Sequence, residues 1–294
     1  MNNHMPTPHT ESKRVKTFRL EVAKEIPKFP NDKATLQALE ALSLQSLLIH
    51  YHNWRIRYVS PRPRTFSVES TALLDPRWST LNSKITSLLE KVSAGEDLTL
   101  HLSRAIHKRG YTPASIEKSL ESDTWADKDF LLNVMGYHHF HLGSTEHLNS
   151  PASRTNELIF AKVDRDKFTV VGIFDHDVFI SSCDSAKGMT KERKRLWKTF
   201  EEHLARGLEP GTAYCPPIIT TSGHSMGSVV FARDYVNVIR EVDPKIDDFD
   251  YVKELYKEVP FPKKLKLQWC LRFLDLGLFD ATSGLFFLFR RGPN

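Results

Sequence analysis

Hydrophobic and polar positions change period along the chain, from helical spacing in the N-terminal part to the alternation of β-strands near the middle. Apolar residues recur every three or four positions in two early stretches, which predicts helices over 31–51 and 80–92. Farther on, short runs of β-branched and aromatic residues lie between polar turns, which predicts strands over 137–142, 157–163 and 168–175. The pattern therefore predicts an α+β protein whose N-terminal region is helical and whose centre is an antiparallel sheet.

The second and third predicted strands are expected to form a hairpin. They are joined by Asp164-Arg-Asp-Lys167, and short polar residues of this kind tolerate the backbone angles of a tight turn. A charged helix is predicted over 191–206. Two more β-like runs, over 265–273 and 285–289, predict further strands in the C-terminal region, with 275–283 as their connection.

These changes of pattern divide the chain into three parts. Residues 1–14 are polar and lack periodicity, which predicts a disordered leader. Residues 15–125 form a mainly helical region, apart from a short extended segment expected over 18–29, where apolar residues alternate. Residues 126–294 form an α+β region that holds the predicted sheet.

The composition indicates a soluble globular protein, with 40% hydrophobic and 26% charged residues among 294. No apolar run approaches the roughly 20 residues of a membrane span, and the N-terminus has no apolar signal core. We therefore expect a cytoplasmic protein with no membrane partner. A net charge of +5 and an isoelectric point near 9.0 favour anionic partners, and they permit a nucleic acid without demanding one.

The chain has thirteen histidines, and three of them lie in the first predicted strand. Side chains of a strand alternate between its faces, so His139 and His141 share one face and His138 points to the other. His176 comes directly after the third strand, and Arg154 lies in the polar loop between the first two. Imidazole titrates near neutral pH and can exchange protons with a substrate. The cluster is therefore the predicted functional site.

Four basic residues are candidates for contacts with nucleic acid. Arg55 and Arg57 lie among aromatic residues at the end of the first helix, where rings can stack on bases and guanidinium groups can pair with phosphates. Lys162 and Arg165 lie beside the hairpin turn. The structural alternative for the helix end is that its aromatic rings are buried while the arginine side chains extend into solvent.

Gly223-His-Ser-Met-Gly227 matches the G-x-S-x-G pattern of serine hydrolases. In those enzymes a histidine that follows the serine in the chain deprotonates it, and no histidine follows His224 here. We therefore interpret the glycines of this motif as turn residues.

The order of the β-rich segments carries a family resemblance, limited to about residues 136–180. A strand with His and Leu over 138–142 is followed by a polar loop, an apolar strand over 158–162, a turn, and a strand that closes on His-Asp-x-Phe over 176–179. This order resembles the RelE/YafQ-like toxin endoribonucleases, in the superfamily that contains barnase and EndoU. The resemblance implies a RelE-like sheet, an RNA substrate, no cofactor or metal, and an inhibitory antitoxin protein as a partner.

Under this resemblance His139 or His141 corresponds to the early strand histidine of the family, His176 to the late one, and Arg154 to a phosphate-binding residue. The expected activity is a metal-independent endoribonuclease, as a toxin or phage-defence effector. The proton of the 2′-hydroxyl goes to a base, a cation stabilises the phosphorane, and an acid protonates the leaving oxygen. Two alternatives stay open: a zinc hydrolase with His139, His141 and His176 as ligands, and a non-catalytic nucleic-acid-binding module.

Overall fold

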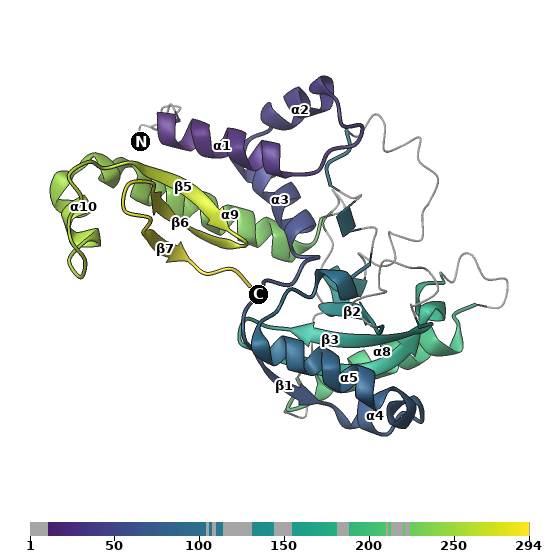
Figure 1. The fold of residues 1–294 in the computed structure, drawn as a ribbon. Coiled ribbons are helices and arrows are strands. Elements are labelled where there is room, and N and C mark those ends of the chain that lie inside the picture. Colours follow the sequence, from purple (N-terminus) through teal and green to yellow (C-terminus); the bar gives the residue numbers. More distant parts are fainter. Residues whose placement is uncertain are drawn as a thin grey trace.

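The computed structural model describes residues 11–103, 106–107, 110–113, 131–143, 155–180, 188–209, 211–212, 220 and 224–293. Helices and two β-sheets form an α+β fold, as the hydrophobic pattern predicts. The two sheets lie in different parts of the molecule, each beside its own helices (Figure 1).

The sheet that holds the histidines has four strands in the order β1-β4-β3-β2. Their bounds are Thr65–Val68 for β1, Tyr137–His141 for β2, Glu157–Val163 for β3 and Lys167–Asp175 for β4. The three predicted strands pair antiparallel, within one residue of the expected bounds. In the turn between β3 and β4, the amide of Asp164 donates to the carbonyl of Lys167 at 2.9 Å. The sequence did not predict β1, which pairs parallel to β4 at the edge.

Helices cover both faces of this sheet (Figure 1). One face packs against α4 (Ser70–Leu73) and α5 (Arg77–Ala94), and its core includes Phe140, Ile159 and Phe168. The other face packs against α8 (Lys191–Ala205) through Tyr137, Phe160 and Phe174. Alternation along each strand thus separates two apolar layers, and His139 and His141 share a face with Tyr137.

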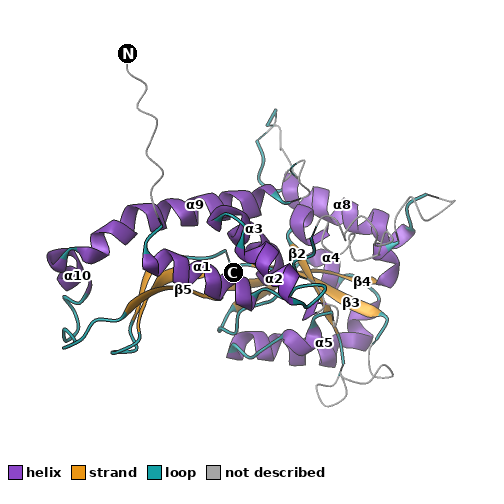
Figure 2. Ribbon diagram, turned by 90° about the horizontal axis from the view of Figure 1, so that it is seen from above, coloured by secondary structure: helices purple, strands orange, loops and turns teal. Residues whose placement is uncertain are grey.

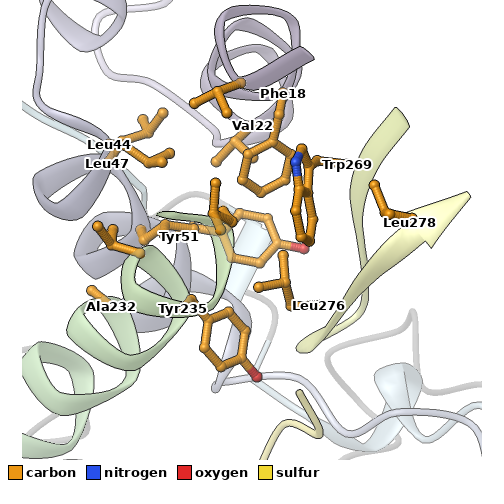
Figure 3. Packing of buried hydrophobic residues seen from close by; sticks show 14 of the residues in the cluster. Phe18, Val22, Leu44, Leu47, Tyr51, Ala232, Tyr235, Trp269, Leu276 and Leu278 are labelled. Atoms are coloured by element: carbon orange, nitrogen blue, oxygen red, sulfur yellow. The ribbon is translucent and has the colours of Figure 1, made fainter. Parts of the chain in front are cut away.

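The second sheet is an antiparallel meander in the order β5-β6-β7. Its strands are β5 (Leu267–Arg272), β6 (Asp275–Asp280) and β7 (Phe286–Arg290). Its helices are α1 (Lys13–Glu25), α2 (Lys33–Glu40), α3 (Leu44–Arg55), α9 (Met226–Val242) and α10 (Phe249–Leu255). Figure 3 shows their common core, in which Phe18 and Tyr51 from the N-terminal helices meet Tyr235, Trp269 and Leu276.

Two tyrosine hydroxyls hold the turn between β5 and β6. Tyr51 donates to the carbonyl of Phe273 at 2.8 Å, and Tyr235 donates to the carbonyl of Leu274 at 2.6 Å. Phe273 has a φ of 59°, in the left-handed region that favours glycine. The helices at the two ends of the chain therefore fix a turn whose backbone is intrinsically unfavourable.

The core residues group the chain differently from the boundary expected between 125 and 126. Residues of α1 and α3 share one core with α9 and the β5-β6-β7 sheet. Residues of α5 instead share a core with β2, β3 and β4. The chain therefore leaves the first of these cores after α3, contributes Tyr111 to it on the way, and returns to it at α9.

Three details of the predicted elements are wrong. Residues 11–14 belong to an ordered segment, because Ser12 caps α1 and Arg14 is ion-paired with Asp243 at 3.1 Å. The segment over 18–29 begins as helix rather than strand, since residues 15, 18 and 22 share a helical face that is buried. The helix expected over 31–51 is two helices, because Ser43 caps the start of α3.

A fourth correction concerns the C-terminal region. The segment 275–283 was expected to be a connection, but it contains β6. Leu276 and Leu278 alternate there with Gly277 and Phe279, and both leucines are fully buried. The segment was predicted as a connection because Gly277 and the aspartates at its two ends, Asp275 and Asp280, are residues typical of turns.

Candidate functional site

Three of the predicted histidines come together at one end of the four-stranded sheet. His139 and His141 project from the α8 face of β2, and His176 opens the short helix η4 (His176–Phe179) that follows β4. The ring centroids of His139 and His141 are 6.0 Å apart, and those of His141 and His176 are 5.4 Å apart. We call these three residues the histidine cluster.

The histidine cluster lies against aromatic rings. The His139 ring centroid is 5.0 Å from that of Phe179 and 6.0 Å from that of Phe160. His139 is half-buried and His141 is buried, whereas His176 is exposed. Solvent therefore reaches the histidine cluster from the side of His176, and the other two imidazoles lie deeper.

A backbone carbonyl orients the ring of His176. Its Nδ1 atom lies 2.9 Å from the carbonyl oxygen of Asn156 and 3.2 Å from the Oδ1 atom of the same residue. Both are acceptors, so Nδ1 carries the proton and donates it. In the neutral imidazole the lone pair is then on Nε2, which makes Nε2 the basic atom.

The first turn of α8 holds η4 in place. Thr190 donates from its hydroxyl to the Asp177 carbonyl at 2.9 Å, and Glu192 accepts from the Asp175 amide at 3.2 Å. The guanidinium of Arg193, only 7% exposed, donates to two carbonyls at the end of η4. Buried carbonyls that lose such a donor are costly. Arg193 therefore fixes the segment that carries His176.

An ion network braces the same end of β4. Asp75 accepts from Arg77 at 2.8 Å and from Arg195 at 3.1 Å, and Arg195 also pairs with Glu192 at 2.8 Å. Burial acts to raise the pKa of Asp75, but hydrogen bonds from Arg77 hold that pKa below its ordinary value. The Arg195 guanidinium lies 4.1 Å from the ring centroid of Phe174. These charges tie α5 and α8 to the strand that precedes His176.

Two further histidines are structural. His138, on the opposite face of β2, places Nε2 at 2.9 Å from the carbonyl of Ile56, and burial lowers its pKa to about 4. The Nδ1 atom of His101 lies 3.0 Å from the carbonyl of His141, and burial lowers the pKa of His101. His101 thus anchors the edge strand of the histidine cluster. Sequence analysis missed this contact, because nothing local to either residue indicates it.

At the end of α3 the buried rings agree with the structural alternative, but Arg55 does not extend into solvent as that alternative expects. The Arg55 guanidinium lies 4.3 Å from the ring centroid of Phe273 and 5.3 Å from that of Trp54. Trp54 is buried and Arg57 is half-buried. The aromatic rings of this segment are therefore core residues, and Arg55 is stacked within the protein.

The candidates at the hairpin differ from each other. Arg165 forms a bidentate ion pair with Asp275 at 2.7 and 2.9 Å, which links the hairpin to the second sheet. Lys162 keeps 48% of its side-chain surface exposed and lies 3.6 Å from a carboxylate oxygen of Asp164. Arg154, the expected phosphate-binding residue, lies outside the described residues. Of the two hairpin candidates, Lys162 is the more accessible to a ligand.

Ser225 of the G-x-S-x-G pattern caps α9. Its hydroxyl accepts from the Ser228 amide at 3.2 Å, and the hydroxyls of the two serines are 2.9 Å apart. Ser228 also meets His52 at 2.8 Å and Asn53 at 2.6 Å. Ser225 is 5% exposed, which suits a capping residue more than a nucleophile. Gly227 lies within α9, so it is not the turn residue that we expected.

Two further findings concern metals and membranes. Among the described residues, no three histidine, cysteine, aspartate or glutamate side chains are grouped as ligands of a metal ion. The geometry of the histidine cluster therefore gives the zinc alternative no support. In the same part of the chain, no helix combines the length and the apolar composition needed to cross a membrane.

The resemblance to RelE/YafQ-like toxins stays a prediction, because no family model, no curated protein and no solved structure matches this chain.

Proposed function

We propose that this protein is a metal-independent endoribonuclease whose acid and base come from the histidine cluster. The observation that supports the proposal is the pair formed by His141 and His176, with ring centroids 5.4 Å apart at a solvent-accessible end of the sheet. Two adjacent imidazoles can remove one proton and deliver another near neutral pH.

The chemistry needs both roles in a single displacement. The Nε2 atom of His176, whose partner nitrogen donates to Asn156, takes the proton of the substrate 2′-hydroxyl. The 2′-oxygen then forms a bond to the adjacent phosphorus, and the bond from phosphorus to the 5′-oxygen breaks. His141 or His139 donates a proton to this leaving oxygen. The products are a 2′,3′-cyclic phosphate and a free 5′-hydroxyl.

RNA is the preferred substrate class for two reasons. RNA already carries a nucleophile that a general base can activate, the 2′-hydroxyl that DNA lacks. The net charge of +5 also favours a polyanion. The accessible Lys162 is then the described basic residue that we expect to contact a phosphate.

The test is cleavage of a fluorescent single-stranded RNA, with EDTA in one arm and added zinc in another. We expect cleavage in EDTA, with cyclic phosphate ends seen by mass spectrometry. His141→Ala and His176→Ala are each expected to lower the rate by about 10² to 10⁴, the usual contribution of a positioned acid or base. His107→Ala is the matched control, since His107 is exposed and outside the histidine cluster.

Two results would contradict the proposal. If EDTA abolishes cleavage and zinc restores it, the zinc hydrolase becomes the better explanation. If the double variant His141→Ala/His176→Ala cleaves as fast as the wild type while the melting temperature is unchanged, the histidine cluster is not the catalytic site.

A further inference from the structure

The β5-β6-β7 sheet has one covered face and one open face. Its inner residues, such as Trp269 and Leu278, belong to the core shared with α1, α3 and α9. Phe279, Phe286 and Leu288 alternate with the inner residues and are not part of that core. Figure 2 shows α9 along one side of the sheet. We call the residues of this open side the outer face.

Two aromatic residues are neighbours in the register of the outer face. Phe279 of β6 and Phe286 of β7 are directly paired in the sheet register, and both are half-buried. Gly277 lets the second ring lie close to the backbone, because a Cβ atom there would be 2.5 Å from the Cζ atom of Phe286. The ring of Phe286 therefore packs closely against the strand at Gly277.

One cation, the guanidinium of Arg272, lies over both rings, and a second lies farther along the same face. The Arg272 guanidinium lies 4.4 Å from the ring centroid of Phe286 and 5.4 Å from that of Phe279. Lys266, exposed just before β5, falls on the same face by alternation, roughly 20 Å from Arg272 at the rise of a strand. Asp275, the carboxylate at the end of this face, is already paired with Arg165 at 2.7 Å.

We propose that the outer face binds single-stranded RNA, an inference that rests on the proposed function for its choice of ligand. Bases stack on Phe279 and Phe286, and the guanidinium of Arg272 extends the stack or pairs with a phosphate. Lys266 pairs with a phosphate farther along the strand. Aromatic rings bordered by cations match a strand of bases and phosphates. They match less well a second copy of this sheet, which would bring two Arg272 side chains together.

The test separates binding from cleavage. The probe is a fluorescent 2′-O-methyl RNA of about 12 nucleotides, within the range that a single-strand-binding fold covers. It cannot be cleaved by the proposed mechanism because its 2′-oxygen is blocked. Fluorescence anisotropy gives Kd for the full chain, and the melting temperature of each variant checks its fold.

The variants remove the aromatic rings and keep an apolar side chain at each position. Phe279→Leu and Phe286→Leu are each expected to raise Kd about 5- to 150-fold, the usual contribution of one stacked base. Arg272→Gln is expected to weaken binding and to lower the slope of log K against log salt by about 0.7. Phe249→Leu is the matched control, because this phenylalanine is 62% exposed but lies on α10.

The outcomes distinguish this inference from the proposed function. His107→Ala, at an exposed site outside the histidine cluster, is expected to keep full affinity for the probe, and Phe279→Leu/Phe286→Leu to lose it. If no RNA is cleaved but the outer-face variants still lose binding, the proposed function fails and this inference stands. If the double variant keeps the wild-type Kd, the outer face does not bind RNA. If the wild type is a dimer, the double variant is a monomer and Kd is unchanged, the outer face is instead the contact surface for a second copy of this chain.

Discussion

Acid is expected to unfold this protein through two histidines that are buried in their neutral form. His52 is 6% exposed beneath α9, and burial lowers its pKa from 6.5 to about 4. His138 is also 6% exposed, and burial lowers its pKa to about 4 although the Ile56 carbonyl opposes the change. The unfolded chain therefore binds protons at both sites at a higher pH than the folded protein does.

The sign and size of the effect follow from these values. A folded-state pKa below the unfolded value means that the stabilisation is complete above pH 6.5 and is lost as the pH falls towards 4. At pH 5 each histidine accounts for about 2 kcal/mol of lost stability relative to pH 8, and the pair for about 4 kcal/mol. Domains are stable by only about 5–15 kcal/mol, so this loss is large.

The assay is urea unfolding followed by tryptophan fluorescence at pH 8 and pH 5. His52→Asn and His138→Gln each replace the hydrogen-bonding ring nitrogen with an amide that does not titrate. When the pH falls from 8 to 5, the free energy of unfolding of the double variant is expected to decrease by about 4 kcal/mol less than that of the wild type. His107→Gln, at an exposed site, should behave like the wild type. Equal pH dependence in the double variant and the wild type would refute the reasoning.

Three other predictions concern single contacts. Arg193→Met is expected to lower the free energy of unfolding by about 1–3 kcal/mol, because it removes the donor to the carbonyls of Val178 and Ile180, and to slow RNA cleavage. Calorimetry and the RNA assay check both. A double-mutant cycle on Arg165 and Asp275, measured by urea unfolding, should give a coupling free energy of about 1 kcal/mol. A coupling of zero would show that this ion pair does not stabilise the contact between the two sheets. Gly207→Ala is expected to lower the free energy of unfolding by about 1 kcal/mol, because this glycine has a positive φ. Gly95→Ala is expected to lower it by more, since Gly95 also has a positive φ and a Cβ atom there would lie 2.4 Å from the backbone nitrogen of Pro63. Thermal melts compare the two variants.

The strands of the four-stranded sheet were predictable because their signals are local. Alternation placed His139 and His141 on one face, and the polar turn at Asp164 fixed the hairpin. Their approach to His176 follows from that register, since β2 pairs with β3 and β3 pairs with β4. The catalytic roles of these residues were predicted from the chemistry of imidazole and from the family resemblance, and they stay predictions.

The parts that sequence analysis missed depend on contacts between distant residues. The parallel pairing of Thr65 with Lys167 joins segments about a hundred positions apart, and no local pattern specifies it. His101 anchors His141 across forty positions, and Arg193 reaches η4 from the next helix. The grouping of the cores was missed for the same reason, because periodicity identifies an apolar face but not the element that covers it.

The turn held by Tyr51 and Tyr235 has a consequence for the order of folding. Tyr51 and Phe273 are 222 positions apart, so during synthesis the N-terminal helices wait for β5 and β6 before their apolar faces are covered. The sheet with the histidine cluster is made in between, and its cores consist of residues from the interval 59–200. We expect this interval to acquire its structure first on the ribosome and the N-terminal helices to dock last, after a long exposure that makes them the natural target of a chaperone.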